Sequence, residues 1–283
     1  MLPKLASRPD WQIAAILAAT LRVFYSAMAA AFSPFLHPDP ALIRSNQLTE
    51  HLPSPHGLQF ALLGIWERFD TLWFLRIAER GYDRPMAVLF YPLYPAAIRP
   101  LSALIPPIAA TLFISTVAAF FLFWGLLRLA ANLPAVTRFR VLLLFCVWPP
   151  SFVLFAGYSD SLTIALVVWS IVFARQEDWA FATVCGFLAA SARPTGVLVF
   201  IPLAWMALRS RQLRAFSVLL TPLGLVGYWS WLRWSGHPSV VEAYRLYQGM
   251  TLAPPWKGLA EALCGKTPGE IVKKERRGFF SFK

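Results

Sequence analysis

Charged residues are scarce in this chain, and several long stretches contain none. Asp and Glu together number 14 of 283 residues, hydrophobic residues make up 58%, and the mean hydropathy is +0.56. Long stretches without charge include residues 101–127, 141–159, 161–174, 194–208 and 215–232. A helix of roughly 20 apolar residues crosses a membrane, where a charge is costly. This pattern excludes an ordinary soluble domain and predicts an all-α polytopic membrane protein.

The motifs of several enzyme classes are also missing. The sequence contains no Walker loop, no GxSxG and no GxGxxG, so ATP hydrolysis, serine hydrolysis and Rossmann cofactors have no support. The four histidines show no HExxH or comparable pairing, and neither zinc nor another divalent metal is implied. The three cysteines show no CxxC spacing, which indicates unpaired thiols. The sequence therefore implies no metal and no cofactor.

Basic residues give the chain a formal charge of +12, but they are not pooled in one segment. They gather at the ends of the apolar runs, as topology determinants and contacts to anionic lipids do. This distribution argues against nucleic acid as a partner and predicts contact with membrane lipid. The positive-inside rule places the basic N-terminus and the clusters at 128–140 and 209–214 on the cytoplasmic side.

Apolar runs and basic clusters together predict seven spans. The first is 11–35, whose basic flank resembles a signal peptide but whose length and internal Arg22 favour a membrane helix. Residues 86–105 cannot be a complete crossing, because three prolines each remove a helix hydrogen-bond donor. The other spans are 107–127, 141–157, 161–174, the two halves of 179–208, broken at 193–196, and 215–232. This path creates a long first extracytoplasmic loop at about 34–85.

Residues 66–95 hold acidic, aromatic and basic side chains between uncharged stretches. The periodicity after Asp70 predicts a helix lying at the membrane interface. Its lipid face would carry Phe69, Trp73, Phe74 and Ile77, and its polar face Arg76, Glu79 and Arg80. Asp70 is interpreted either as the N-cap of this helix or as a catalytic carboxylate. Glu67 is the reserve candidate for acid–base work or for metal binding.

Further candidate residues fall on the same, outer side of the predicted topology. Tyr158 and Asp160 lie in a turn between spans, suited to sugar hydroxyls or to capping the next helix. Arg193 precedes Pro-Thr-Gly and is suited to a phosphate, or to snorkelling toward headgroups. Arg233 and Arg245 lie in an aromatic, basic segment suited to a lipid phosphate, a sugar or an interfacial aromatic belt.

Several of these segments resemble one protein family. The block W-x(2)-F-D-x(2)-W-F-L-x-I-A-x(2)-G-Y at 66–82, followed by F-Y-P-L-Y-P at 90–95, resembles the PIG-V family of mannosyltransferases and its bacterial relatives. The turn at 158–161 resembles the family's YSES-like turn, with Asp160 where Glu is common, and residues 193–196 match its RPTG stretch. Order and spacing agree over about residues 10–260.

The resemblance implies a GT-C-type glycosyltransferase that uses a polyprenyl-phosphate sugar on the non-cytoplasmic face. It would form one membrane domain over residues 1–260, in the plasma membrane of a bacterium or the endoplasmic reticulum of a eukaryote. The family's first-loop carboxylate falls on Asp70, which would act as the base in an inverting transfer of a hexose, mannose by the resemblance. Arg193, Arg233 and Arg245 would bind the departing phosphate, and Tyr158 and Asp160 the sugar. Stacking or lipid surfaces would come from Trp66, Trp73, Tyr91 and Tyr94.

One departure from the family keeps other functions open. Members of the family continue for further spans, whereas the basic, polar tail at 261–283 reads as a truncated or divergent end. The sequence leaves open whether a partner subunit supplies the remaining spans. The alternatives are an inactive or accessory membrane paralogue and a transporter or flippase of a phosphate-bearing lipid.

Overall fold

The structure is a computed structural model that describes residues 8–35, 57–248 and 256, and within these ranges every regular element is helical. Three helical stretches are long and apolar enough to cross a membrane, namely Asp10–Phe35, Pro107–Leu129 and Leu213–Trp234. The all-α fold and the presence of membrane-spanning helices therefore agree with the sequence analysis. The number of seven spans stays a prediction.

The chain divides into two compact units. The first comprises Met1–Gly81 and Phe90–Tyr228, and the second comprises Tyr82–Leu89 and Trp229–Lys283. Each unit is described by itself. The expectation of one domain over residues 1–260 stays a prediction.

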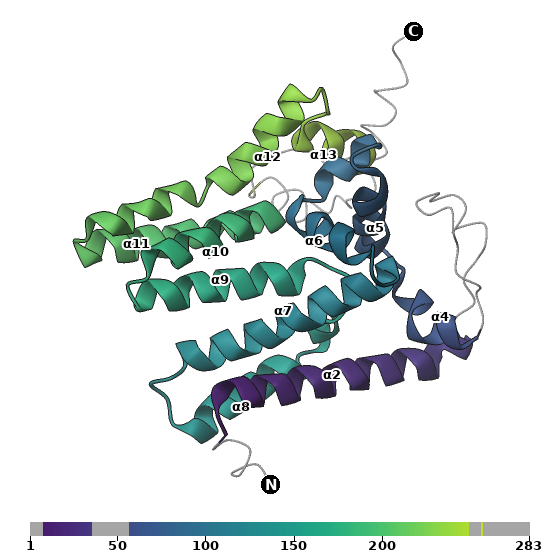
Figure 1. Ribbon diagram of the computed structural model, residues 1–283, viewed down its shortest axis with the longest axis horizontal. Coiled ribbons are helices and arrows are strands. Elements are labelled where there is room, and N and C mark those ends of the chain that lie inside the picture. Colours follow the sequence, from purple (N-terminus) through teal and green to yellow (C-terminus); the bar gives the residue numbers. More distant parts are fainter. Residues whose placement is uncertain (1–7, 36–56, 249–255, 257–283) are drawn as a thin grey trace. The chain divides into compact units, whose positions relative to one another are not determined.

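Four long helices form the centre of the first unit. They are α2 (Asp10–Phe32), α7 (Pro107–Leu129), α9 (Asp160–Arg175) and α10 (Trp179–Ala192), which lie side by side in this order (Figure 1). Lipid is as apolar as a leucine side chain, so helices in a membrane associate through close packing, often at small residues. Gly125 of α7 provides such a contact, since a Cβ there would lie 2.6 Å from Val168 of α9.

Prolines and glycines set where the helices of this unit break. α8 (Ala135–Val147) ends before two prolines and is followed by the 3₁₀ helix η4 (Pro149–Leu154). The expected third span is therefore a 13-residue helix and a 3₁₀ segment. The break predicted at 193–196 is confirmed, because η5 (Pro194–Val199) separates α10 from α11 (Phe200–Ser210). The last candidate span consists of two elements, η6 (Leu213–Leu220) and α12 (Leu223–Trp234).

The basic turns of the first unit gather at one end. Arg175, at the end of α9, donates to the Leu129 carbonyl at the end of α7 over 3.0 Å. Arg138 of α8 pairs with Asp10 at the start of α2, also at 3.0 Å. The side chain of Gln212, which follows α11, donates to Glu177 after α9 over 2.7 Å. This grouping is the one that the positive-inside rule requires of the N-terminus and the two basic clusters.

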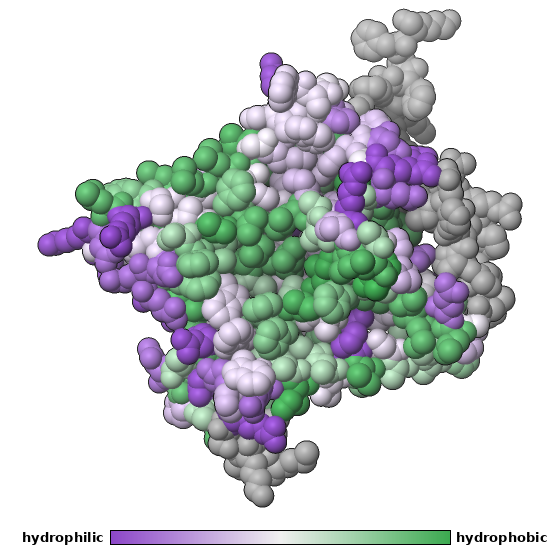
Figure 2. All heavy atoms as spheres, viewed as in Figure 1, coloured by the Kyte–Doolittle hydropathy of each residue, from purple (hydrophilic) through white to green (hydrophobic). Residues whose placement is uncertain are grey.

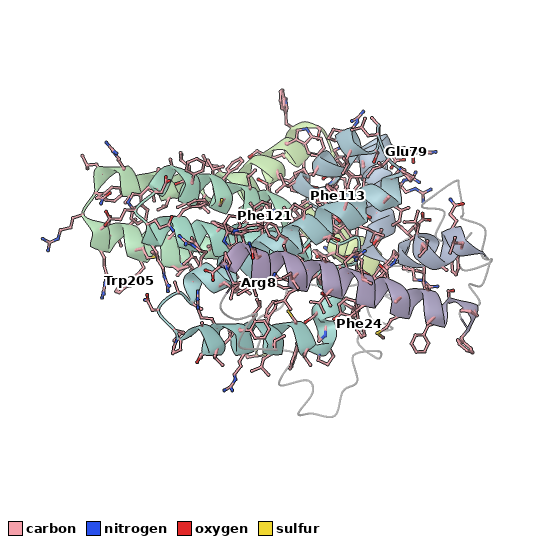
Figure 3. All side chains as sticks on the ribbon, turned by 60° about the horizontal axis from the view of Figure 1, so that its bottom comes forward. Arg8, Phe24, Glu79, Phe113, Phe121 and Trp205 are labelled. Atoms are coloured by element: carbon pink, nitrogen blue, oxygen red, sulfur yellow. The ribbon has the colours of Figure 1, made fainter. Side chains whose placement is uncertain are left out.

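The outer faces of these helices are apolar. Hydrophobic residues spread over α7, α9 and α10, and hydrophilic residues gather toward the helix ends (Figure 2). Phe24 of α2, Phe113 of α7 and Trp205 of α11, labelled in Figure 3, are 52%, 56% and 58% exposed. Contiguous apolar surface of this kind is rare on soluble monomers and fits contact with lipid.

The helix predicted after Asp70 is present as α5 (Asp70–Arg80), but its expected surroundings are wrong. Phe74 and Ile77 are buried, and the Phe74 ring lies 4.9 Å from that of Tyr94 in α6 (Leu93–Leu101). Arg76, expected on a solvated face, is also buried. The prolines around α6 provide the reason. They limit it to nine residues, and this short helix packs against the face of α5 that was assigned to lipid. That residues 86–105 do not cross the membrane stays a prediction.

Short elements precede α5 in the first unit, and a small cluster forms the second. Before α5 come η1 (Ser33–Phe35), α4 (Leu58–Leu62) and η2 (Gly64–Trp66). In the second unit α13 (Val240–Gln248) packs against η3 (Pro85–Leu89). The Tyr82 ring there lies 5.1 Å from that of Trp231 and 6.2 Å from that of His237.

Gly196→Ala tests the packing at the break between α10 and α11. A Cβ at Gly196 would lie 2.1 Å from the Ala189 carbonyl oxygen, and backbone cannot turn aside as a flexible side chain can. Overpacking costs about 1–3 kcal/mol, so the Tm in detergent should fall by several degrees. Gly227→Ala on α12 is the control, because nothing lies within 4 Å of its Cβ, and its Tm should stay the same or rise. Equal Tm values for the two variants would contradict the packing described.

Candidate active site

Asp70 lies in the first turn of α5 but does not cap it. The N-cap residue is Phe69, and no side chain caps the helix by a hydrogen bond. The N-cap interpretation of Asp70 is therefore wrong. Phe69 has φ = 50°, an unusual conformation for a residue with a bulky side chain, and its ring is 77% exposed. Such backbone strain is concentrated at functional sites.

Asp160 and Arg193 form an ion pair between two helix ends. Asp160 is the first residue of α9, where no side chain caps the helix by a hydrogen bond, so the capping interpretation is wrong here as well. Arg193 directly follows α10 in an extended conformation, with φ −153° and ψ 152°. Its guanidinium contacts the Asp160 carboxylate, and both side chains stay partly exposed. The pair therefore lies at the end of the first unit opposite the basic turns.

Asp70 and Tyr158 lie near this pair. Tyr158 comes two residues before Asp160, and its neighbour Gly157 packs against Thr71, the residue after Asp70. Burial raises the pKa of Asp70, Arg193 opposes the rise, and Asp160 adds to it. Burial also raises the pKa of Tyr158 to about 12, with further contributions from Asp70 and Asp160. Exposed charges are largely screened from one another beyond about 10 Å, so groups that shift one another's pKa lie near one another. Four of the predicted site residues are thus brought together from three distant segments of the chain.

Small and hydroxyl-bearing residues of α5 and α7 pack against the turn that carries Tyr158. A Cβ at Gly157 would lie 2.6 Å from the Thr71 methyl carbon and 2.8 Å from the Thr111 hydroxyl, so the turn before Tyr158 touches α5 and α7. Ser115 of α7 donates to the Tyr158 carbonyl over 3.2 Å. The sequence analysis missed these residues. The signal was present as Thr111 and Ser115, two polar residues four apart in an apolar span.

Buried hydroxyl groups are also found in this region. Tyr94 lies 2.7 Å from the Ser115 hydroxyl and donates to the Thr111 carbonyl over 3.0 Å. The hydroxyl oxygens of Thr71 and Ser161 are buried and have no hydrogen-bond partner within the described ranges. Buried polar groups are nearly always satisfied, and an exception marks a place for water or a ligand atom.

The four aromatic residues predicted as stacking or lipid surfaces divide into two groups. Tyr94 and Tyr91 are buried, and the Tyr91 ring packs 4.7 Å from that of Tyr228, so the structure contradicts a surface role for both. Helix-spaced aromatic residues pack in a core as readily as against a ligand. Trp73 and Trp66 stay partly exposed, with Trp73 stacked on Phe90 at 5.4 Å.

The remaining candidates lie apart from the four coupled residues or in the second unit. Burial raises the pKa of Glu67, just after η2, to about 7, but the charges that act on Asp70 are those of Arg193 and Asp160. Arg233 and Arg245 belong to the second unit, where both are exposed in the last turns of α12 and α13. Within the described part of the chain, no group of three His, Cys, Asp or Glu residues could hold a metal ion.

Gly157→Ala tests whether the turn before Tyr158 fixes the start of α5. The added methyl group would push against Thr71 and should lower the free energy of unfolding by about 1–3 kcal/mol. Thr71→Ala in the same chain removes the contacting atoms and should restore part of the loss. A double-mutant cycle measured by chemical unfolding should give a coupling above about 0.5 kcal/mol. Additive effects would show that the two residues do not touch.

Comparison with protein-family models, with curated proteins and with solved structures finds no match for this chain. The resemblance to the PIG-V family therefore rests on the motifs quoted above.

Proposed function

We propose that this chain is an integral membrane glycosyltransferase. It moves a hexose, mannose by its resemblance to the PIG-V family, from a polyprenyl-phosphate donor to an acceptor hydroxyl. The observation that carries the proposal is the coupling of Asp70 and Tyr158 to the Asp160–Arg193 pair. The same residues lie in the three motifs on which the resemblance rests, at 66–82, 158–161 and 193–196.

Asp70 acts as the general base. Its carboxylate takes the proton of the acceptor hydroxyl, the acceptor oxygen bonds to the anomeric carbon, and the bond from that carbon to the phosphate oxygen breaks. The electron pair leaves with the lipid phosphate, and the anomeric configuration inverts. A carboxylate makes a better base as its pKa approaches the working pH, and burial moves Asp70 in that direction.

Arg193 and Tyr158 bind the two parts of the donor. A guanidinium has five N–H donors, more than one carboxylate can accept, so Arg193 can hold Asp160 and also stabilise the departing phosphate. Tyr158 keeps its proton at neutral pH because its pKa is raised to about 12, and it donates to a sugar oxygen. Asp160 accepts from a sugar hydroxyl. Trp66 and Trp73 offer ring faces to the substrate. The binding of phosphate by Arg233 and Arg245 stays a prediction from the sequence.

The membrane arrangement in this proposal has seven spans and an extracytoplasmic loop at about 34–85. The site faces the non-cytoplasmic side of the plasma membrane in a bacterium, or of the endoplasmic reticulum in a eukaryote. Support comes from the position of the Asp160–Arg193 pair, which lies at the opposite end of the first unit from Arg128–Arg140 and Arg209–Arg214. The substrates are lipid-linked and no cofactor is required.

Asp70→Asn tests the general base. The amide has the same shape but cannot take a proton, so transfer of radiolabelled mannose from polyprenyl-phosphate mannose should fall by at least about 100-fold. The purified chain would be assayed in lipid, with a native membrane extract as acceptor. Glu79→Gln is the control, since it removes an exposed carboxylate from the same helix and should leave transfer unchanged. Full turnover by Asp70→Asn would exclude this base, and a folded wild type without transfer would favour an accessory role.

The pH dependence of transfer tests the coupling around Asp70. Protonation of the base stops the reaction, so kcat/KM should fall toward acid at a pH above the ordinary aspartate range of about 3.9. Asp160→Asn removes a charge that raises the pKa of Asp70 and should shift this fall to lower pH. Arg193→Gln removes a charge that lowers it and should shift the fall to higher pH. Shifts in the same direction would contradict the arrangement.

A further inference from the structure

Arg22 is a charged residue near the middle of an apolar helix. It stands 12 residues after Asp10 and 10 before Phe32, which places it about 18 Å and 15 Å from the two ends of α2 at 1.5 Å per residue. A cation at this depth is costly and normally faces a partner of opposite charge. Among the residues that the structure describes, no carboxylate pairs with it.

The contacts of Arg22 hold its guanidinium without neutralising it. One terminal nitrogen donates to the carbonyl oxygen of Phe155. The guanidinium carbon lies 5.0 Å from the ring centroid of Trp66 and 5.5 Å from that of Phe155. These cation–π contacts hold the group in place, but an aromatic ring carries no net charge that could neutralise it. The positive charge stays uncompensated.

Two buried donors at this place have no acceptor. The Nε of Arg22 and the indole Nε1 of Trp66 each lack a hydrogen-bond partner within residues 8–35, 57–248 and 256. They belong to side chains in direct contact, on segments 44 residues apart in the sequence. A cationic N–H beside a neutral N–H suits one negatively charged oxygen, which a phosphate provides.

The residues around Arg22 indicate which kind of phosphate compound could reach it. Val23 and Phe24, which follow Arg22 on α2, are 68% and 52% exposed, so the faces of the helix beside Arg22 are lipid-facing. Arg22 also lies close to the candidate active site, because it donates to the carbonyl of Phe155, three residues before Tyr158. A phosphate reaching such a place needs an apolar chain to carry it into the membrane.

We propose that Arg22 and Trp66 form a binding site for the phosphate group of a membrane lipid. The site is distinct from the Asp160–Arg193 pair and does not require that sugar be transferred. Two kinds of lipid carry the required chemistry, a polyprenyl phosphate and an anionic phospholipid. In either case the phosphate oxygen accepts from both orphaned donors and neutralises the Arg22 guanidinium.

Lipid binding to the full chain in phosphatidylcholine nanodiscs tests the site. Native mass spectrometry would compare polyprenyl phosphate with polyprenol, which lacks the phosphate. The wild type should prefer the phosphate by at least about 10-fold, the worth of one hydrogen bond to a charged group. Trp66→Phe keeps an aromatic ring but removes the indole N–H together with the second ring, and should reduce this preference about 10-fold. Arg22→Gln should abolish the preference.

Matched variants separate this site from general charge effects and from the proposed reaction. Arg99→Gln removes an exposed cation from the end of α6 and should keep the phosphate preference. Asp70→Asn should also keep it while losing transfer, so either proposal can fail alone. Phosphatidylglycerol added as competitor identifies the source: full competition assigns the site to phospholipid, and none assigns it to the polyprenyl lipid. Equal binding of polyprenol, or unchanged preference in folded Trp66→Phe and Arg22→Gln chains, would overturn the proposal.

Discussion

The Asp160–Arg193 ion pair depends on where two neighbouring helices end. α9 begins at Asp160, and α10 stops at Ala192 because Pro194 cannot continue the hydrogen bonding of a helix. If α10 ran on by one turn, Arg193 would adopt helical geometry and its side chain would be redirected. The pair is therefore a consequence of one proline placed after one arginine. Gly196 completes the break by letting the chain turn back against the Ala189 carbonyl.

Asp70 reaches this pair through contacts that are steric rather than electrostatic. Thr71 is fully buried and touches Gly157, so the start of α5 and the turn before Tyr158 are held at a fixed separation. The hydrogen bond from Ser115 to the Tyr158 carbonyl ties the same turn to α7. These contacts fix the backbone at Asp70. The pKa of Asp70 is raised because its carboxyl group is partly buried there. Rigid support of this kind is what a charged group needs if it is to be effective without reorganisation.

The sequence predicted those features of the fold that single residues determine locally. The break at 193–196 and the short helix α6 follow from proline chemistry, and the helix after Asp70 follows from periodicity. The sequence does not show whether an apolar helix face packs against protein or against lipid, because the two are equally apolar. Phe74 and Tyr94 were assigned to lipid or substrate for this reason, and both are buried. The positive φ of Phe69 leaves no sequence signal.

Charge balance distinguishes the active site from the site at Arg22. A donor phosphate beside Asp70 and Asp160 adds negative charge where two carboxylates already oppose one another, and Arg193 is shared with Asp160. Such an addition favours the protonated form of Asp70, which would disable the base. The charges that act on Asp70 are those of Arg193 and Asp160, so a lipid phosphate held at the proposed Arg22 site would not add to them. Within the described ranges no carboxylate pairs with Arg22, and its charge is therefore available to a phosphate.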